Sequence, residues 1–243
     1  MFNKNSTSYI FIFALVICAL CSLALALVSE GLRPRREMNE AVERQKNILK
    51  AAGLADSVRK EVSADIAVLF AEKIEALVID AKGERVPGIL PDQAVLENGQ
   101  YPLYILKEAG EIQGYVFPIS GKGLWSTIYG YLALEPDGVT LKGISFYKHG
   151  ETPGLGGEIE ARWFQQNFQG KKIYDVARQT LRPVRVAKGR TGDRYHGEDL
   201  EFVVDGISGA TMTGNGITAM LDYWLRVYDP YFQKVRQSQA PSL

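Results

Sequence analysis

The sequence predicts an α+β fold, in which one N-terminal transmembrane helix precedes a soluble domain of mixed hairpins and helices. Ile10 to Val28 carry no charge and no proline, and about 19 such residues suffice to cross a hydrocarbon core of about 30 Å. Further along the chain, short strand-like runs alternate with turn signals and amphipathic segments. Strands paired through tight turns favour hairpins over a doubly wound parallel sheet.

The apolar N-terminal segment has one alternative interpretation. Ala24-Leu25-Ala26 resembles the cleavage site of a signal peptide. The apolar run is longer than a signal core of about 7–15 residues, so we favour an uncleaved anchor. Cys18 and Cys21 both lie in this run. At lipid depth they lack the further polar ligands of a metal site, and we interpret them as small residues of a membrane helix.

Charge bears on both partners and orientation. The chain has 28 basic and 28 acidic residues and a formal net charge of +0, which argues against a nucleic-acid-binding face. Lys4 precedes the apolar segment, whereas Arg33, Arg35 and Arg36 follow it. Taken alone, this distribution predicts a cytoplasmic soluble domain.

Hydrophobic periodicity divides the rest of the chain. We expect a short tail at 1–9, the transmembrane helix at 10–28, a helical stalk and connecting region at 29–98, the main domain at 99–230 and a C-terminal tail at 231–243. Helices are predicted at 34–52, stopped by Gly53, and at 64–76.

The main domain begins with two predicted hairpins. They pair 101–107 with 111–117 and 129–134 with 140–147, through turns at Ala109-Gly110 and Pro136-Asp137-Gly138. A helix at 158–168 with Ile159, Trp163 and Phe168 facing inward, short strands at 184–187 and 202–204, and a final helix at 215–228 complete the expected elements. The final helix has an apolar stripe made of Ile217, Met220, Leu221, Trp224 and Leu225.

Three segments of the main domain place several glycines among hydroxyl and aromatic side chains. They are Gly121–Thr127, Glu151–Gly157 and Asp205–Thr211. Glycine allows close backbone approach and positive φ, so that amide N–H groups can converge on an anion or a flat ring. One such segment is weak support, but three in one domain predict a cofactor cleft.

Thr211 is the strongest single candidate in these segments. It lies just before Gly214-Asn215-Gly216 and the last predicted helix. At a helix N-terminus, unsatisfied N–H groups and the helix dipole favour a negative charge. A phosphate esterified to Thr211 would meet that environment. The alternative is that Thr211 or Thr213 is only an N-cap.

The other candidates each have a plainer alternative. Trp125 would stack on a ring or pack in the core, and Lys122 would neutralise a phosphate or stay solvated. His149 would donate a hydrogen bond to a ligand. His149 and His196 have no clustered partners, so neither a metal site nor a Ser/His/Asp triad is predicted. We expect Glu151 and Glu158 to be solvated. The sequence has no nucleotide-binding glycine fingerprint, which argues against direct NADH binding.

Three stretches carry a family resemblance. Gly121–Tyr131 (GKGLWSTIYGY), His149–Ile159 (HGETPGLGGEI) and Asp205–Gly216 (DGISGATMTGNG) follow one N-terminal anchor in this order. The chain thereby resembles the C subunit of the sodium-translocating NADH:quinone oxidoreductase. The G subunit of the related Rnf complexes shares the last motif and a TPGLG-like segment, and is the alternative family.

The resemblance implies an FMN-binding domain at 99–230. In this family, FMN is esterified through its phosphate to the last threonine of the SGAT sequence, here Thr211, by a flavin transferase. The soluble domain lies on the periplasmic side of the bacterial inner membrane. Electrons pass through it from an iron–sulfur centre to the FMN of a neighbouring membrane subunit, within a six-subunit sodium pump.

The cofactor-binding residues expected on this basis are Thr211, Ser208, Gly209, Ala210, Asp205, Trp125, Ser126, Thr152, Gly154, Leu155, Gly156 and Lys122. Ser208 would bond the phosphate, and Asp205 would help the transferase or the local loop. Trp125 and Leu155 would lie near the ring. We expect no catalytic residue, no metal ligand and no complete enzymatic activity from this chain alone. The alternatives from other classes are an anchored ligand-binding module without redox function and a standalone anchored reductase.

Overall fold

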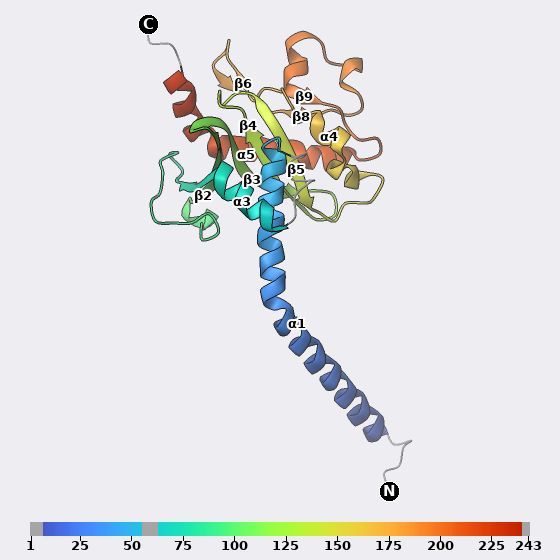
Figure 1. Cartoon of the computed structure of the whole chain (residues 1–243). Coiled ribbons are helices and arrows are strands. Elements are labelled where there is room, and N and C mark those ends of the chain that lie inside the picture. Colours follow the sequence, from blue (N-terminus) through green and yellow to red (C-terminus); the bar gives the residue numbers. More distant parts are fainter. Residues whose placement is uncertain (1–6, 55–62, 240–243) are drawn as a thin grey trace. The chain divides into compact units, whose positions relative to one another are not determined.

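The computed structural model describes residues 7–54 and 63–239, and Figure 1 colours the chain from its N-terminus (blue) to its C-terminus (red). The chain divides into two compact units, one ending at Arg44 and the other beginning at Gln45. The helices are α1 (Thr7–Ala51), α3 (Ser63–Lys73), α4 (Arg162–Gln166) and α5 (Thr211–Gln239), with short 3₁₀ helices η1 (Leu96–Asn98), η2 (Gly156–Glu160), η3 (Thr191–Asp193) and η4 (Gly197–Phe202).

The described part of the N-terminal unit is helical, and α1 is long and apolar enough to cross a membrane. The helix predicted to begin at Pro34 is instead a continuation of α1, which runs through this proline. Arg33 bridges Glu30 at 3.3 Å and Glu37 at 2.9 Å across that point, which supports the turn that lacks a proline N–H. At the far end Gly53 has φ +88° and stops the helix as predicted.

The C-terminal unit is built on a five-stranded antiparallel sheet in the order β1-β2-β3-β4-β5. The strands are β1 (Ile74–Ile79), β2 (Tyr101–Glu108), β3 (Glu111–Lys122), β4 (Thr127–Leu134) and β5 (Leu141–Lys148). Both predicted hairpins, β2–β3 and β4–β5, are confirmed. Ala109 and Gly110 have φ +51° and +86°, as a two-residue type I′ turn requires.

Strand β1 corrects the prediction of a helix over 64–76. Helix α3 ends at Lys73, and Ile74 begins a strand that pairs with β2 from Ile74↔Leu106 to Ile79↔Tyr101. The apolar spacing suits a helix locally, but the partner strand lies far along the chain and supplies hydrogen bonds that favour the extended form. The sheet therefore includes residues from the region predicted to connect the stalk to the main domain.

Helices cover both faces of the sheet. Helix α5 packs across one face, chiefly on β3, and its predicted apolar stripe is buried (Figure 1). It extends past Tyr228 and through Pro230, because Phe232 is also buried in the core. The last turns of α1 cover β5 on the opposite face, where Ser145 Oγ donates to the Asn47 carbonyl oxygen at 3.0 Å.

The predicted helix at 158–168 is split into η2 and α4. Ile159 and Phe168 are buried as expected, but Trp163 is 47% exposed, so its predicted inward position is wrong. Ala161 is extended between the two short helices, which changes the direction of the residues that follow. The remaining short strands are β6 (Tyr174–Asp175), β7 (Thr180–Leu181), β8 (Arg185–Val186) and β9 (Val203–Val204). Of these, β8 and β9 lie within the predicted strands at 184–187 and 202–204.

Candidate functional site

The three glycine-containing segments meet at the N-terminus of α5 and enclose a pocket of about 170 Å³. The fold thus brings together residues that lie far apart in the chain, and a cleft is present where the three segments predicted one. The pocket is lined by Leu124, Trp125, Glu151, Thr152, Leu155, Gly156, Gly209, Ala210, Thr211, Met212 and Thr213.

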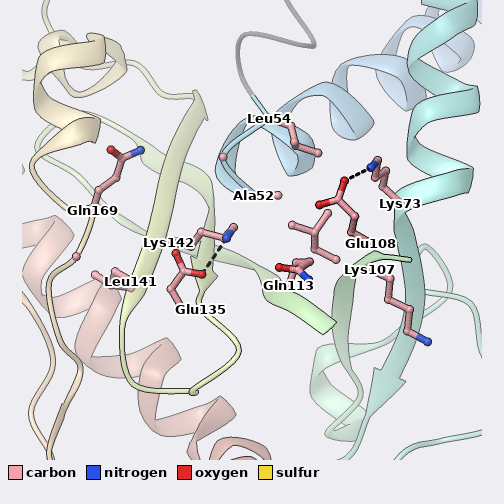
Figure 2. Close-up of a pocket in the computed structure, with 13 residues that line it drawn as sticks. Ala52, Leu54, Lys73, Lys107, Glu108, Gln113, Glu135, Leu141, Lys142 and Gln169 are labelled. Carbon is pink, nitrogen blue, oxygen red and sulfur yellow. Dashed lines mark hydrogen bonds and ion pairs between the residues drawn. The ribbon is translucent and has the colours of Figure 1, made fainter. Parts of the chain in front are cut away.

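A second pocket is larger, at about 440 Å³, but its chemistry is different (Figure 2). Lys73 Nζ lies 2.7 Å from Glu108 Oε1, and Lys142 Nζ lies 2.8 Å from Glu135 Oε2. Each of these charges is therefore compensated by a neighbour. None of the three glycine segments contributes to its lining, so its larger size is no argument that it is the predicted cofactor cleft.

The predicted cofactor residues divide into two groups. Those that line the pocket are Trp125, Thr152, Leu155, Gly156, Gly209, Ala210 and Thr211. Those outside the described lining are Lys122, Ser126, Gly154, Asp205 and Ser208. The assignment of both groups to a cofactor stays a prediction.

Thr211 is the first residue of α5 and is exposed. The first helical hydrogen bond runs from Gly214 N to Ala210 O at 3.0 Å, which places Ala210 at the N-cap position. Thr211 and Thr213 therefore belong to the first turn and are not the cap. The N–H groups of this turn have no partners within the helix, and together with the helix dipole they favour an anion.

Gly209 shapes the approach to Thr211. Its φ is +75°, a left-handed conformation that favours glycine, and an added Cβ would lie 2.8 Å from Leu155 Cδ2. Glycine at this position thus lets the segment before α5 pass directly against the Glu151–Gly157 segment. Ala210 is buried beside it, so the turn that presents Thr211 is anchored in the protein.

Glu151 is a site residue that the sequence analysis missed. We expected a solvated carboxylate, but Glu151 is only 5% exposed. Its Oε1 accepts a hydrogen bond from Trp125 N at 3.0 Å, and its Oε2 accepts from Leu124 N at 3.2 Å and from Thr213 Oγ1 at 2.6 Å. A carboxylate at the start of a glycine-rich segment is the signal that would have pointed to it.

Two opposing effects set the pKa of Glu151. Burial alone raises this pKa, because it disfavours the charged form. The hydrogen bonds from the Thr213 hydroxyl and from the Trp125 and Leu124 N–H groups outweigh burial, so the pKa of Glu151 lies below its usual value. The pocket therefore has a buried negative charge at neutral pH.

Two glycines make room for this carboxylate. An added Cβ at Gly123 would lie 2.5 Å from Glu151 Oε1, and one at Gly156 would lie 2.6 Å from Thr213 Oγ1. These separations are shorter than van der Waals contact, so a side chain at either position would displace the carboxylate or its partner. The glycines predicted to approach a cofactor serve, at these two positions, to pack around Glu151.

Asp205 holds a neighbouring loop. Its Oδ1 accepts hydrogen bonds from Thr191 N at 2.7 Å and from Thr191 Oγ1 at 2.6 Å. The bond from the Thr191 hydroxyl, followed by the one from its N–H, lowers the pKa of Asp205. This geometry supports the local-loop alternative.

His149 contacts the backbone of Glu151. Its Nδ1 accepts a hydrogen bond from Glu151 N at 3.1 Å, and its Nε2 lies 3.1 Å from Glu160 Oε1.

Large apolar side chains surround the mouth of the pocket. Trp125 is 71% exposed, which excludes the core interpretation of this tryptophan. Leu124, Leu155 and Met212 are also exposed and line the same pocket. The pocket is smaller than the roughly 300–1,000 Å³ that encloses a typical ligand. The lining therefore offers the N-terminus of a helix, which favours an anion, and an apolar mouth that a flat ring can contact.

The class of this protein follows from its likeness to known proteins. A family model described as FMN-binding domain matches residues 123–226, from the Trp125 loop into α5. The protein is thus an FMN-binding protein. It is 36% identical to the C subunit of the Na(+)-translocating NADH-quinone reductase of Neisseria meningitidis, over 98% of both chains. It is 32% identical to the corresponding protein of Vibrio alginolyticus, over 90% of this chain and 91% of the relative. The chain belongs to the family of the C subunit of the Na(+)-translocating NADH-quinone reductase.

A solved structure agrees with this assignment. The crystal structure of the C subunit from Parabacteroides distasonis superposes with a TM-score of 0.71 at 31% identity. The match covers 83% of this chain and 96% of that chain. The fold around the pocket is therefore the fold of this family.

Proposed function

We propose that this chain holds FMN through a phosphoester bond to Thr211 and relays electrons within a sodium-translocating NADH-quinone reductase. Its family and its FMN-binding domain make it an FMN-carrying electron-transfer subunit of this oxidoreductase complex. Bound FMN supplies the redox chemistry, since its ring accepts and returns electrons. The chain supplies the attachment point, the orientation and the local charge.

The position of Thr211 carries the proposal of a covalent bond. Its side chain lines the pocket from the first turn of α5, where the N–H groups and the positive end of the helix dipole would face the phosphate. Gly209 and the buried Ala210 hold the preceding turn, so Thr211 remains at the surface for a flavin transferase. The exposed Trp125 and Leu155 then offer an apolar platform to the ring.

The remaining subunits and the membrane complete the proposed setting. The apolar α1 and the family make the chain a membrane-anchored subunit with other subunits of the complex as partners. We place the soluble domain on the periplasmic side of the bacterial inner membrane, where the transferase would act. The basic residues after the anchor favour the opposite side, but long domains are translocated largely regardless of such charges. Protease treatment of right-side-out cells tests this, and a protected domain would refute it.

Intact mass measurement tests the covalent bond. The full-length chain and its Thr211→Ala variant are each produced together with a flavin transferase. We expect an added mass of FMN minus water in the parent chain and none in the variant. Thr152→Ala is the matched control, because Thr152 lines the same pocket and should leave the added mass in place. FMN mass retained by Thr211→Ala would refute the assignment.

Two alternatives are separated by further observations. The near-complete coverage of these relatives favours the sodium pump over the Rnf-type subunit. A ligand-binding module without redox function predicts that the purified protein cannot be reversibly reduced. Reversible bleaching of the flavin absorbance on reduction and reoxidation would exclude that alternative.

A further inference from the structure

We propose that Glu151 is the positioning residue of the flavin site, because its carboxylate joins the Leu124-Trp125 loop to the first turn of α5. It would thereby set where the exposed indole of Trp125 lies relative to Thr211. This inference rests on the proposed function, since it assigns Glu151 a role toward FMN attached at Thr211.

The hydrogen bonds of Glu151 connect two of the glycine-containing segments with the first turn of α5. The carboxylate belongs to the Glu151–Gly157 segment, two of its donors are backbone N–H groups of the Gly121–Thr127 segment, and the third is Thr213 on α5. Bonds to an ionised acceptor are stronger than bonds between neutral groups, and the 2.6 Å bond from Thr213 Oγ1 is of this kind. One side chain thus links elements that lie widely apart along the chain.

The carboxylate of Glu151 is tightly packed. It is buried, and the absence of side chains at Gly123 and Gly156 is what makes room for its two oxygens. Thr213 is likewise buried, at 1% exposed. Because interiors are close-packed, the loop and the helix can shift relative to each other only if this group of bonds breaks.

The Leu124-Trp125 loop is also closed on itself. Gly123 N donates to Ser126 O at 2.8 Å, and Gly150 N donates to Ser126 Oγ at 2.6 Å. With its backbone N–H held by Glu151, Trp125 directs its indole outward to the mouth of the pocket. The backbone is therefore fixed while the ring-bearing side chain stays available to a flat ligand.

Glu151 also determines the charge near the ring. Among the described residues that line the pocket, none is a lysine or arginine, and Glu151 is the one that carries a formal charge. A nearby negative charge disfavours the added negative charge of a reduced flavin. Removing the charge of Glu151 should therefore raise the midpoint potential of the attached flavin, which a purely structural role of this residue would not do.

The test uses the full-length chain with Glu151→Gln, which keeps the size of the side chain and removes its charge. Glu158→Gln is the matched control, because Glu158 lies nearby, is half-buried and is outside the described lining of the pocket. Amide hydrogen exchange is measured on chains produced without the transferase. We expect the Leu124 and Trp125 amides to exchange about tenfold faster or more in Glu151→Gln, as loss of a charge-assisted bond predicts, and no change in Glu158→Gln.

The same variants are then produced with the transferase. In Glu151→Gln we expect a higher midpoint potential and an altered fluorescence of the attached flavin. Thr213→Val should change the flavin fluorescence in the same direction as Glu151→Gln does. Thr213→Ser keeps the hydroxyl, so its flavin fluorescence should equal that of the parent chain. If Glu151→Gln fails to fold, the comparison of Thr213→Val with Thr213→Ser tests whether the Thr213–Glu151 hydrogen bond positions the flavin site.

The outcomes separate the two levels of the proposal. If the parent chain gains no FMN mass, the proposed function fails and this inference fails with it. If the parent chain gains FMN, but Glu151→Gln retains the parental potential and fluorescence, Glu151 is only structural and the inference alone is overturned. Unchanged exchange of the Leu124 and Trp125 amides in Glu151→Gln would overturn it as well.

Discussion

Replacing Gly156 with alanine tests whether the site depends on close packing between the glycine segments and α5. An added Cβ would lie 2.6 Å from Thr213 Oγ1 and 2.9 Å from Glu151 Oε2, two atoms that are themselves hydrogen-bonded at 2.6 Å. Both residues are buried, so neither can yield without breaking that bond. Loss of a hydrogen bond to a charged group costs about 1.5–3 kcal/mol, and we expect a decrease of about 2 kcal/mol in the free energy of unfolding.

Thermal unfolding of the full-length protein in detergent measures this loss. For a domain of this size, 1 kcal/mol corresponds to about 2–4 °C, so Gly156→Ala should lower Tm by about 4–8 °C. In a Thr213→Ala background the same substitution should cost less, because the bond it breaks is already absent. A Tm within about 1 °C of the parent protein, or full additivity with Thr213→Ala, would refute the reasoning.

Gly154 provides the matched control in the same segment. Its φ is +74°, but among the described residues an added Cβ would meet nothing within 4 Å. Gly154→Ala should therefore cost only the strain of a left-handed residue, about 1–2 kcal/mol, with no coupling to Thr213. Gly154→Asn should recover part of this loss, since asparagine tolerates that conformation. If the effects of Gly154→Ala and Thr213→Ala on the free energy of unfolding were not additive, the close contact of Gly156 with Thr213 would not explain the effect of Gly156→Ala.

Two further substitutions and one pH series each test a single feature. Gly143→Ala would place a Cβ 2.5 Å from the Ala51 carbonyl oxygen, and we expect a loss of about 1–3 kcal/mol in urea unfolding as the end of α1 is pushed off β5. Trp125→Ala should leave Tm nearly unchanged, because the side chain is 71% exposed, but it should change the flavin fluorescence; unchanged fluorescence would show that the ring lies elsewhere. The folded-state pKa of Glu151 is lowered from 4.5, so its contribution to stability is present above about pH 4.5 and is lost as pH falls through the lower folded-state pKa. In urea unfolding between pH 7 and about pH 3, the free energy of unfolding of the parent chain should include this loss, and that of Glu151→Gln should not.

Local signals explain which parts of the fold could be predicted. The Ala109-Gly110 and Pro136-Asp137-Gly138 turns specify hairpins through their own backbone preferences, and both hairpins are present. The spacing of Ile217, Leu221 and Trp224 marks one face of a helix whatever that helix packs against. Strand β1 gave no such signal, because its pairing with β2 depends on a strand well separated from it along the chain.

The site shows the same division. Local sequence is enough to predict the membrane-crossing helix, the hairpins, the three glycine segments and the placement of Thr211 at a helix start, because each depends on neighbouring residues. The burial of Glu151 and the exposure of Trp125 depend instead on how the segments pack together. Whether a carboxylate is solvated depends on donors from distant segments, here Leu124, Trp125 and Thr213, and no local pattern records which donors the fold will bring within 3.2 Å.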